Sequence, residues 1–280
     1  MSAERANIDL QFRSAGGRTF LRNQYVDYPY HITKLLYDDT QERTTPKLIL
    51  QSLSGGIYQG EQLNHKIELG ALARVDIRTQ GSTIVHNSRG LGATSATSIV
   101  LGMGSSIFYV PEPQIIFNGA QYASNISVYG IERAAHAVIG DSFLSYDPVV
   151  EAADVDFRFT MMTSFLNIEG EALAVDKAIV RGISHRRVMK GYRGFASFMF
   201  HGAEFDAPFL EECCSEIEAL DAVAAYSSLP ADAGFNLKAL AADGAVLSRI
   251  LDVVRSRTVL LSNEGNKLTV TEESLSRAYV

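Results

Sequence analysis

The sequence predicts a mainly β fold, with stacked β-helix-like or prism-like layers and two C-terminal α-helices packed on them. Two observations lead to this class. From about residue 18 to residue 201, apolar and polar residues mostly alternate with a period of two, and glycines interrupt the runs. After residue 206 the apolar spacing becomes that of amphipathic helices. A chain of 280 residues, 46% of them hydrophobic, can bury a core without disulfide staples.

The first predicted strands are short and lie on both sides of a glycine-rich stretch. Lys47–Leu53 is a compact apolar run, and the stretches Leu63–Leu69 and Ala73–Ile77 alternate apolar with polar side chains. Such alternation is typical of half-buried strands. The Asn118–Gly119 pair further along the chain indicates a turn.

Three later segments share one pattern of strand, glycine turn and strand. They are IELGALARVDI from Ile67, IVLGMGSSIFYV from Ile99 and ISVYGIERAAHAVI from Ile126. Their spacing is irregular, so they form no exact repeat. The pattern fits stacked β layers built from similar units, and it fits independent hairpins equally well.

The last quarter predicts two amphipathic helices. The first follows Asp206, a good N-cap, with Pro208 in its first turn. The second follows Asp243. The two apolar stripes consist of Leu210, Cys213, Cys214, Ile217 and Leu220, and of Val246, Leu247, Ile250, Leu251 and Val254. We therefore expect a β-rich scaffold over residues 1–205, a helical portion of the same domain over 206–262, and a polar tail over 263–280.

Several features of the sequence bear on where the chain is located and on what it binds. Adjacent Cys213 and Cys214 cannot form a relaxed disulfide, so we expect core packing and a cytoplasmic location. The sequence shows no signal peptide and no apolar run of about 18 residues, which predicts no membrane contact. A net charge of −7 argues against nucleic-acid binding. The basic stretch Ser184–Arg193 is interpreted as a solvated or protein-contact loop.

The stretch SLSGGIYQGEQ, Ser52–Gln62, has the glycine spacing of a phosphate-binding loop at Gly55 and Gly60. A phosphate loop also needs a lysine and a helix directly after it. Here Glu61 and a strand-like segment follow, so nucleotide binding is excluded. Two interpretations remain: a glycine turn that presents the Glu61 carboxylate, or a turn with an ordinary solvated glutamate.

Common catalytic motifs are missing from the sequence. It contains no G-x-S-x-G, H-E-x-x-H or C-x-x-C pattern. The six histidines are His31, His65, His86, His136, His185 and His201. Their spacing forms no closed metal pattern, which favours a binding or assembly role over an enzyme. A β-rich carbohydrate-binding protein or enzyme, which the lack of tryptophan weakens, and a metal-independent interaction module are the alternatives.

Five segments in order resemble the urease accessory protein D family, UreD, called UreH in some systems. They are Gly17–Leu36, Leu53–His86, Gly104–Tyr122, Glu169–Val180 and Ala245–Arg257. The second contains the GG-x-x-x-G and T-Q-x-x-T-x-V patterns of the family. Each motif is loose alone, but their order and spacing over nearly the whole chain are specific.

The resemblance implies a non-enzymatic scaffold. Members of the family bind apo-urease and recruit the F-type accessory protein and the G-type GTPase, and together they deliver nickel while a carbamylated lysine is completed in the urease site. It also implies a β-rich stacked fold with an internal passage for the metal. Nickel would then pass transiently, with no cofactor held tightly.

The resemblance also directs attention to particular residues. Gly55, Gly56 and Gly60 match the family's glycine loop, which an aspartate normally follows; this chain has Glu61. Oxygen and imidazole ligands release nickel more readily than thiolates do, so Glu61 is predicted to lie on a transient nickel path. His65 and His86 are predicted helpers on chemical grounds alone.

The chain departs from the family at a second place. The segment Gly140–Pro148 has Asp141 where members usually carry an arginine.

Overall fold

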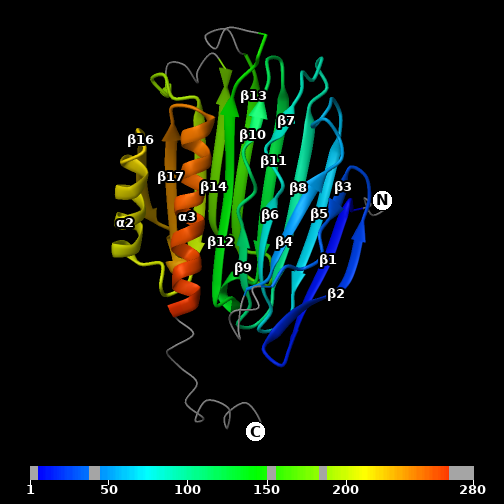
Figure 1. The fold of residues 1–280 in the computed structure, drawn as a ribbon, viewed down its shortest axis with the longest axis vertical. Coiled ribbons are helices and arrows are strands. Elements are labelled where there is room, and N and C mark those ends of the chain that lie inside the picture. The colour runs from blue at the N-terminus through cyan, green and yellow to red at the C-terminus, as the bar shows by residue number, and fades with distance from the viewer. Residues whose placement is uncertain (1–5, 38–44, 150–155, 183–187, 265–280) are drawn as a thin grey trace.

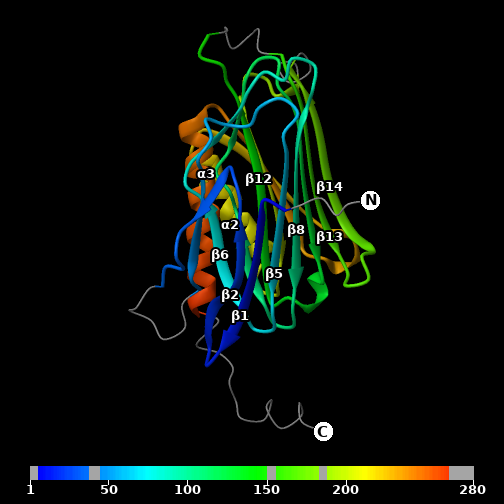
Figure 2. The ribbon, with the colours of Figure 1, turned by 90° about the vertical axis from the view of Figure 1, so that its right-hand side faces the viewer.

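The computed structural model describes residues 6–37, 45–149, 156–182 and 188–264. It consists of two β-sheets that face each other and two helices that cover part of one sheet (Figures 1 and 2). The predicted mainly β class is confirmed. The polar tail was predicted over residues 263–280, but residues 263 and 264 still belong to the last helix. Residues 265–280 of that tail and residues 184–187 of the basic stretch lie outside the described residues.

Sheet A is the seven-stranded sheet of the described chain. Its spatial order is β14 (Ala172–Arg181), β13 (Arg158–Leu166), β11 (Gln121–Tyr129), β8 (Ala93–Leu101), β5 (Gln62–Leu69), β1 (Ile8–Ala15) and β2 (Arg18–Val26). Its five inner strands β13, β11, β8, β5 and β1 run parallel, whereas β14 and β2 pair antiparallel at the two edges.

Sheet B faces sheet A across the core. Its main order in the described chain is β16 (Ala222–Ser228), β17 (Phe235–Ala241), β15 (Gly194–His201), β12 (His136–Ser145), β9 (Ser106–Tyr109), β6 (Arg74–Thr79), β4 (Lys47–Ser52) and β3 (Tyr30–Ile32). Two further short strands, β10 (Gln114–Ile116) and β7 (Thr83–Val85), pair with each other, and β10 also pairs with β12.

The three strand–glycine–strand segments are successive coils of a β-solenoid of about three turns. In each coil the chain leaves a strand of sheet A, turns, and enters a strand of sheet B, as β5 to β6, β8 to β9 and β11 to β12. The strands stack in register, with Ile67 beside Ile99 and Ile99 beside Val128. Stacked layers are therefore confirmed, and independent hairpins are excluded.

Glycine at the corners permits this stacking. A Cβ added to Gly102 would lie 2.8 Å from the carbonyl carbon of Gly70 in the preceding coil. A Cβ on Gly130 would lie 2.7 Å from the carbonyl oxygen of Leu101. Both distances are below any ordinary contact, so the corners can lie this close only without side chains.

Both predicted helices are confirmed as α2 (Ala207–Glu218) and α3 (Gly244–Glu264). The carboxylates of Asp206 and Asp243 accept the Phe209 and Val246 backbone N–H groups, each at 2.9 Å, as N-caps. The helices cover the outer faces of β15, β16 and β17. Neither described helix has the length and apolar composition required to cross a bilayer.

The helices and sheet B enclose one of the apolar clusters. Buried members include Phe198, Phe200, Leu210, Cys213, Leu247 and Ile250. Cys213 lies in this core as predicted, and burial raises the pKa of its thiol to about 12. The strands β16 and β17 between the helices were not anticipated from the sequence, and the short 3-10 turns Ile131–Arg133 and Pro230–Asp232 complete the described elements.

The core between the two sheets is apolar toward both ends of the strands. One cluster includes Ile67, Ile99, Ile107 and Phe165, and the other includes Phe143, Tyr122, Phe157 and Phe159. Between these clusters the inward side chains are polar, and this middle layer forms the candidate site.

Candidate functional site

Strand register collects the polar side chains of the middle layer. On sheet A, Ser95 of β8 lies beside Ser124 of β11, and His65 of β5 lies beside Thr97 of β8. Because side chains alternate between the two faces of a strand, these four groups all point into the space between the sheets. Asp141 of β12 faces them from sheet B, and its carboxylate accepts a hydrogen bond from the Ser124 hydroxyl at 2.8 Å.

These side chains surround a cavity of about 70 Å³. That volume exceeds the roughly 10–15 Å³ needed to hold a water molecule. The lining is Tyr30, Leu50, Ile57, His65, Thr79, Thr83, Ser95, Thr97, Tyr109, Pro111, Glu112, Gln114, Tyr122, Ser124, Ile126 and Asp141. Hydroxyl, imidazole, amide and carboxyl groups thus meet in the middle of an otherwise apolar core.

His65 contributes a neutral imidazole to this cavity. Its Nδ1 lies 3.2 Å from the Thr97 hydroxyl, and its ring packs edge-on against Tyr30. Its Nε2 is buried and has no hydrogen-bond partner among the described residues. Burial lowers the pKa of His65 to about 4, so at pH 7 the ring is in the neutral form that can ligate a metal.

Asp141 contributes a carboxyl group that is only 2% exposed. Burial raises its pKa to about 6, against the smaller opposing effect of the hydrogen bonds from Ser124 and Ser142. Gln114 donates a long hydrogen bond of 3.4 Å to the second carboxylate oxygen. The group is therefore mostly ionised at pH 7 and becomes neutral in mildly acidic solution.

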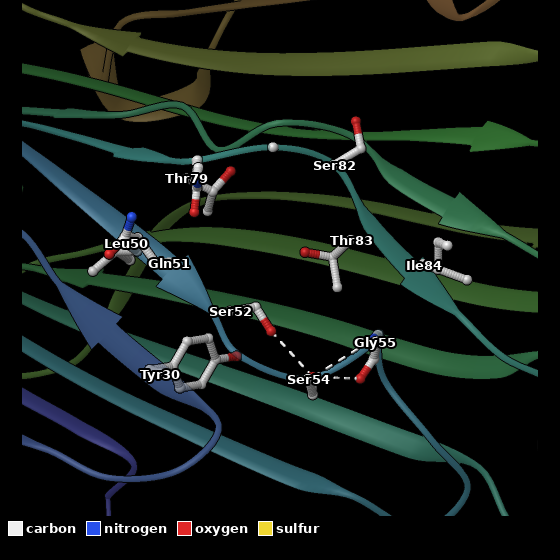
Figure 3. A pocket seen from close by; sticks show the side chains of 13 residues that line it. Tyr30, Leu50, Gln51, Ser52, Ser54, Gly55, Thr79, Ser82, Thr83 and Ile84 are labelled. Carbon is white, nitrogen blue, oxygen red and sulfur yellow. Dashed lines mark hydrogen bonds between the residues drawn. The ribbon is translucent and has the colours of Figure 1, made fainter.

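A surface pocket of about 420 Å³ lies directly beside the cavity. The two spaces share Tyr30, Leu50, Thr79 and Thr83 as lining residues. Hydroxyl groups of Ser52, Ser54 and Thr83 and the phenol of Tyr30 surround the pocket (Figure 3). Through this shared wall the surface pocket offers an approach from solvent to the buried polar groups.

The glycine loop forms one rim of the surface pocket through Gly55 and Gly56. Gly56 has φ of 137°, and a Cβ there would lie 2.4 Å from the Ile84 carbonyl oxygen, so the position requires glycine. The Glu61 carboxylate accepts the Tyr58 backbone N–H at 3.0 Å. His86 stacks on Tyr58, and its Nε2 lies 3.0 Å from the Gly55 carbonyl oxygen. Glu61 and His86 thus hold the shape of the loop.

Polar contacts continue beyond Asp141 on the far side of the cavity. Ser197 of β15 is the cross-strand neighbour of Asp141, and its hydroxyl donates to the Asp176 carboxylate at 2.6 Å. Lys238 of β17 donates to the other oxygen of Asp176 at 2.6 Å. A polar band therefore runs through the core from the surface pocket to this ion pair.

A second carboxylate of the cavity wall is tied to α3. Glu112 forms an ion pair with Arg255 at 2.7 Å, and Arg255 also donates to the Val110 carbonyl oxygen at 2.8 Å. The Arg255 side chain is only 7% exposed. The helix thereby fixes the wall segment between β9 and β10.

The predicted site residues separate into two groups. His65 lines the cavity, whereas Glu61 and His86 lie in the loop beside the surface pocket. Asp141 was noted in the sequence as a departure from the family, not as a site residue. The signal for it was a lone charge inside the apolar run VIGDSFL. The described residues contain no group of three or more His, Cys, Asp or Glu side chains that could hold a metal ion together.

Comparison with known proteins shows one consistent likeness. The family model described as UreD urease accessory protein matches residues 4–270. Urease accessory protein UreD 1 of Methylorubrum populi (strain ATCC BAA-705 / NCIMB 13946 / BJ001) is 30% identical over 257 residues, covering 89% of this chain and 86% of that protein.

Two further relatives agree. Urease accessory protein UreD 3 of Bradyrhizobium sp. (strain ORS 278) is 29% identical over 238 residues, covering 85% of this chain and 84% of its own length. Urease accessory protein UreD 1 of Pseudomonas syringae pv. syringae (strain B728a) is 24% identical over 245 residues, covering 85% of each chain.

Proposed function

The chain belongs to the UreD family of urease accessory proteins, and from this premise we propose that it is a scaffold that binds apo-urease together with F-type and G-type accessory proteins and assists nickel insertion. Membership of the family assigns the chain to urease maturation. The partners and the handling of nickel are the proposed part, and nickel is treated as cargo that is passed on.

The polar band through the core is the observation that carries the proposal. Burying polar groups between two sheets costs stability unless they are paired, and His65 keeps an unpaired buried nitrogen beside the cavity. A purely structural interior would favour apolar side chains at these positions. The arrangement is explained if a polar or charged species passes through the cavity.

The donor set suits weak and reversible binding of a divalent cation. His65 offers a neutral imidazole, and Asp141 offers a carboxylate that is largely ionised at pH 7. Nickel accepts both ligand types, and sites with few oxygen and nitrogen ligands exchange the metal more readily than thiolate cages. Hydroxyl groups of Ser95, Thr97 and Ser124 add weaker oxygen contacts along the way.

The roles of the loop residues follow from their positions in this proposal. Glu61 and His86 shape the rim of the surface pocket, which we assign as one opening of the nickel path. Their contribution would be to keep this opening formed, and the Glu61 carboxylate would also attract a cation toward it. His65 and Asp141 would meet the ion inside.

The test is reconstitution in cells that supply nickel. This chain is co-expressed with the urease structural subunits and with the F-type and G-type proteins, or it is omitted. We expect urease activity and urease-bound nickel to fall to background only when this chain is omitted, and we expect the partners to copurify with it. Unchanged activity without the chain, together with no copurified complex, would refute the scaffold role.

A further inference from the structure

Two arginines face each other at the edge of sheet A. Arg158 of β13 and Arg181 of β14 are direct cross-strand partners, and both are exposed. Like charges opposite each other in neighbouring strands destabilise a sheet. Among the residues the structure describes, neither guanidinium has an acidic partner. The fold therefore places two like charges directly opposite each other at this place.

The pair borders an open pocket of about 430 Å³. Its remaining lining consists of Gly119, Ala120, Gln121, Asp156 and Phe157. Asp156 supplies one carboxylate against two guanidinium groups, so the lining keeps a positive balance. Guanidinium groups bind carboxylates through paired N–H donors, which gives both affinity and orientation.

Further cations lie at this end of the molecule. Met189 packs in the same buried cluster as Phe157, which brings exposed Lys190 to this end. Arg89 follows Ser88, whose hydroxyl accepts the Gln121 backbone N–H at 2.7 Å. Two acidic side chains lie at the same end, Asp156 in the pocket lining and Asp147, whose carboxylate accepts the Asn118 backbone N–H. The two arginines, Arg89 and Lys190 outnumber these two acids, although the whole chain has a net charge of −7.

The arginine pair also lies at the same end of the strands as the surface pocket. In sheet A, Arg158 is in register with Gln121 at the start of β11, and the glycine loop leads into β5 at this end. The backbone N–H of Gly60 in that loop donates to the Leu91 carbonyl oxygen in the neighbouring turn at 3.1 Å. A protein bound at the arginines would therefore lie along the end that carries the proposed opening.

We propose that Arg158 and Arg181 form a docking site for an acidic segment of a partner protein. The assignment of that partner to the urease maturation complex rests on the proposed function, whereas the charge complementarity rests on the arginine pair alone. A nucleic acid fits less well, because its long run of phosphates is bound by an extended basic stripe, whereas this site offers one pair of guanidinium groups in a chain of net charge −7.

The direct test measures binding of a fluorescein-labelled hexaglutamate peptide to the full chain by anisotropy. The double variant Arg158→Glu/Arg181→Glu is compared with Lys66→Glu/Lys177→Glu, which changes the net charge equally on exposed positions of β5 and β14. We expect at least tenfold weaker binding for the arginine variant and near wild-type binding for the lysine variant. Equal affinities would overturn the proposal, and so would tighter binding of a 12-nucleotide oligothymidine than of the peptide.

A second variant distinguishes an effect on peptide binding from an effect on the stability of the fold. Arg181→Glu alone places opposite charges across the strands, so we expect a raised Tm together with weaker peptide binding. A lowered Tm would contradict the repulsion on which the inference depends. The neutral pair Arg158→Gln/Arg181→Gln should also weaken binding while it keeps the fold.

The same variants are then tested in the co-expression with the urease subunits and the accessory proteins. We expect the arginine variant to lose a copurifying partner and most urease activation, while the lysine variant keeps both. If the wild-type chain itself activates no urease, the proposed function fails, but the peptide measurement still decides the docking site. If the wild type activates urease and the arginine variant does so equally, the docking site has no role in maturation and the proposal is overturned.

Discussion

Asp141 is the single residue whose chemistry can be followed furthest. Its carboxyl group lies between two sheets, contacts Ser124 and Gln114, and lines the cavity that His65 also lines. Raising its pKa from 3.8 to about 6 corresponds to a cost of about 3 kcal/mol for the ionised form. A residue kept at such a cost is a candidate for function over stability.

The sign of the pH effect is fixed by this raised pKa. Between pH 4 and pH 6 the folded chain holds the Asp141 proton while the unfolded chain has lost it, so the free energy of unfolding falls as pH rises through this window. Asp141→Asn removes the ionisation. We expect the variant to be more stable than wild type by up to about 3 kcal/mol at pH 7.5 and about equal at pH 4.

Urea denaturation at the two pH values measures this difference, with Asp9→Asn on the outer face of β1 as the control. The same substitution removes the carboxylate that we propose meets nickel in the cavity, so urease activation should fall although stability rises. A variant that loses stability at pH 7.5 would show that the carboxylate is favourably paired and that the burial argument is wrong.

The elements of the fold differ in how far sequence alone predicts them. The strand–glycine–strand units of the three coils were predictable, because alternating strands around a corner glycine such as Gly102 are visible in the sequence. Their stacking into coils was not, because the same pattern fits independent hairpins equally well. The helices were predictable from their caps and apolar stripes. In contrast, β16 is rich in alanine, a weak strand former, and its buried Ala222 and Ala224 pack in the cluster that α2 and α3 cover.

Sequence alone also predicts only part of the candidate site. His65 was predicted for its ligand chemistry, but its place in the cavity depends on register with β8 and on the facing sheet. Asp141 could not be assigned to the same cavity, because β5 and β12 are brought together only by the stacking of separate coils. Glu61 was predicted as a ligand, and its observed bond to the Tyr58 N–H depends on a local turn that the sequence pattern does not define.

At the scale of one element, the cap of α2 is open to a direct test. Asp206 satisfies the Phe209 N–H at the start of the helix. Asp206→Ala should lower the free energy of unfolding by about 1 kcal/mol, measured by urea denaturation. Glu218→Ala, at the exposed last residue of the same helix, is the matched control and should be nearly neutral. An equal effect of both substitutions would mean that the cap adds no stability here.

The molecule as a whole combines an apolar framework with a polar layer in its interior. Apolar clusters at the two ends of the strands and under the helices pack the sheets and helices together. The polar layer between them adds no apolar burial to this framework, and its proposed role is to let nickel pass. A scaffold that only binds partners would need its outer surface and would tolerate a filled interior, so these two roles separate experimentally.

Ser124→Leu distinguishes passage of nickel through the interior from partner binding at the surface. It adds two heavy atoms inside the cavity and removes the hydroxyl that donates to Asp141. Ser127→Leu makes the same change on the opposite face of β11 and is the matched control. We expect both variants to copurify with the urease complex, while only Ser124→Leu loses urease activation and urease-bound nickel. Full activation by a folded Ser124→Leu chain would mean that nickel does not cross the interior, and the chain would then act in maturation through its surface alone.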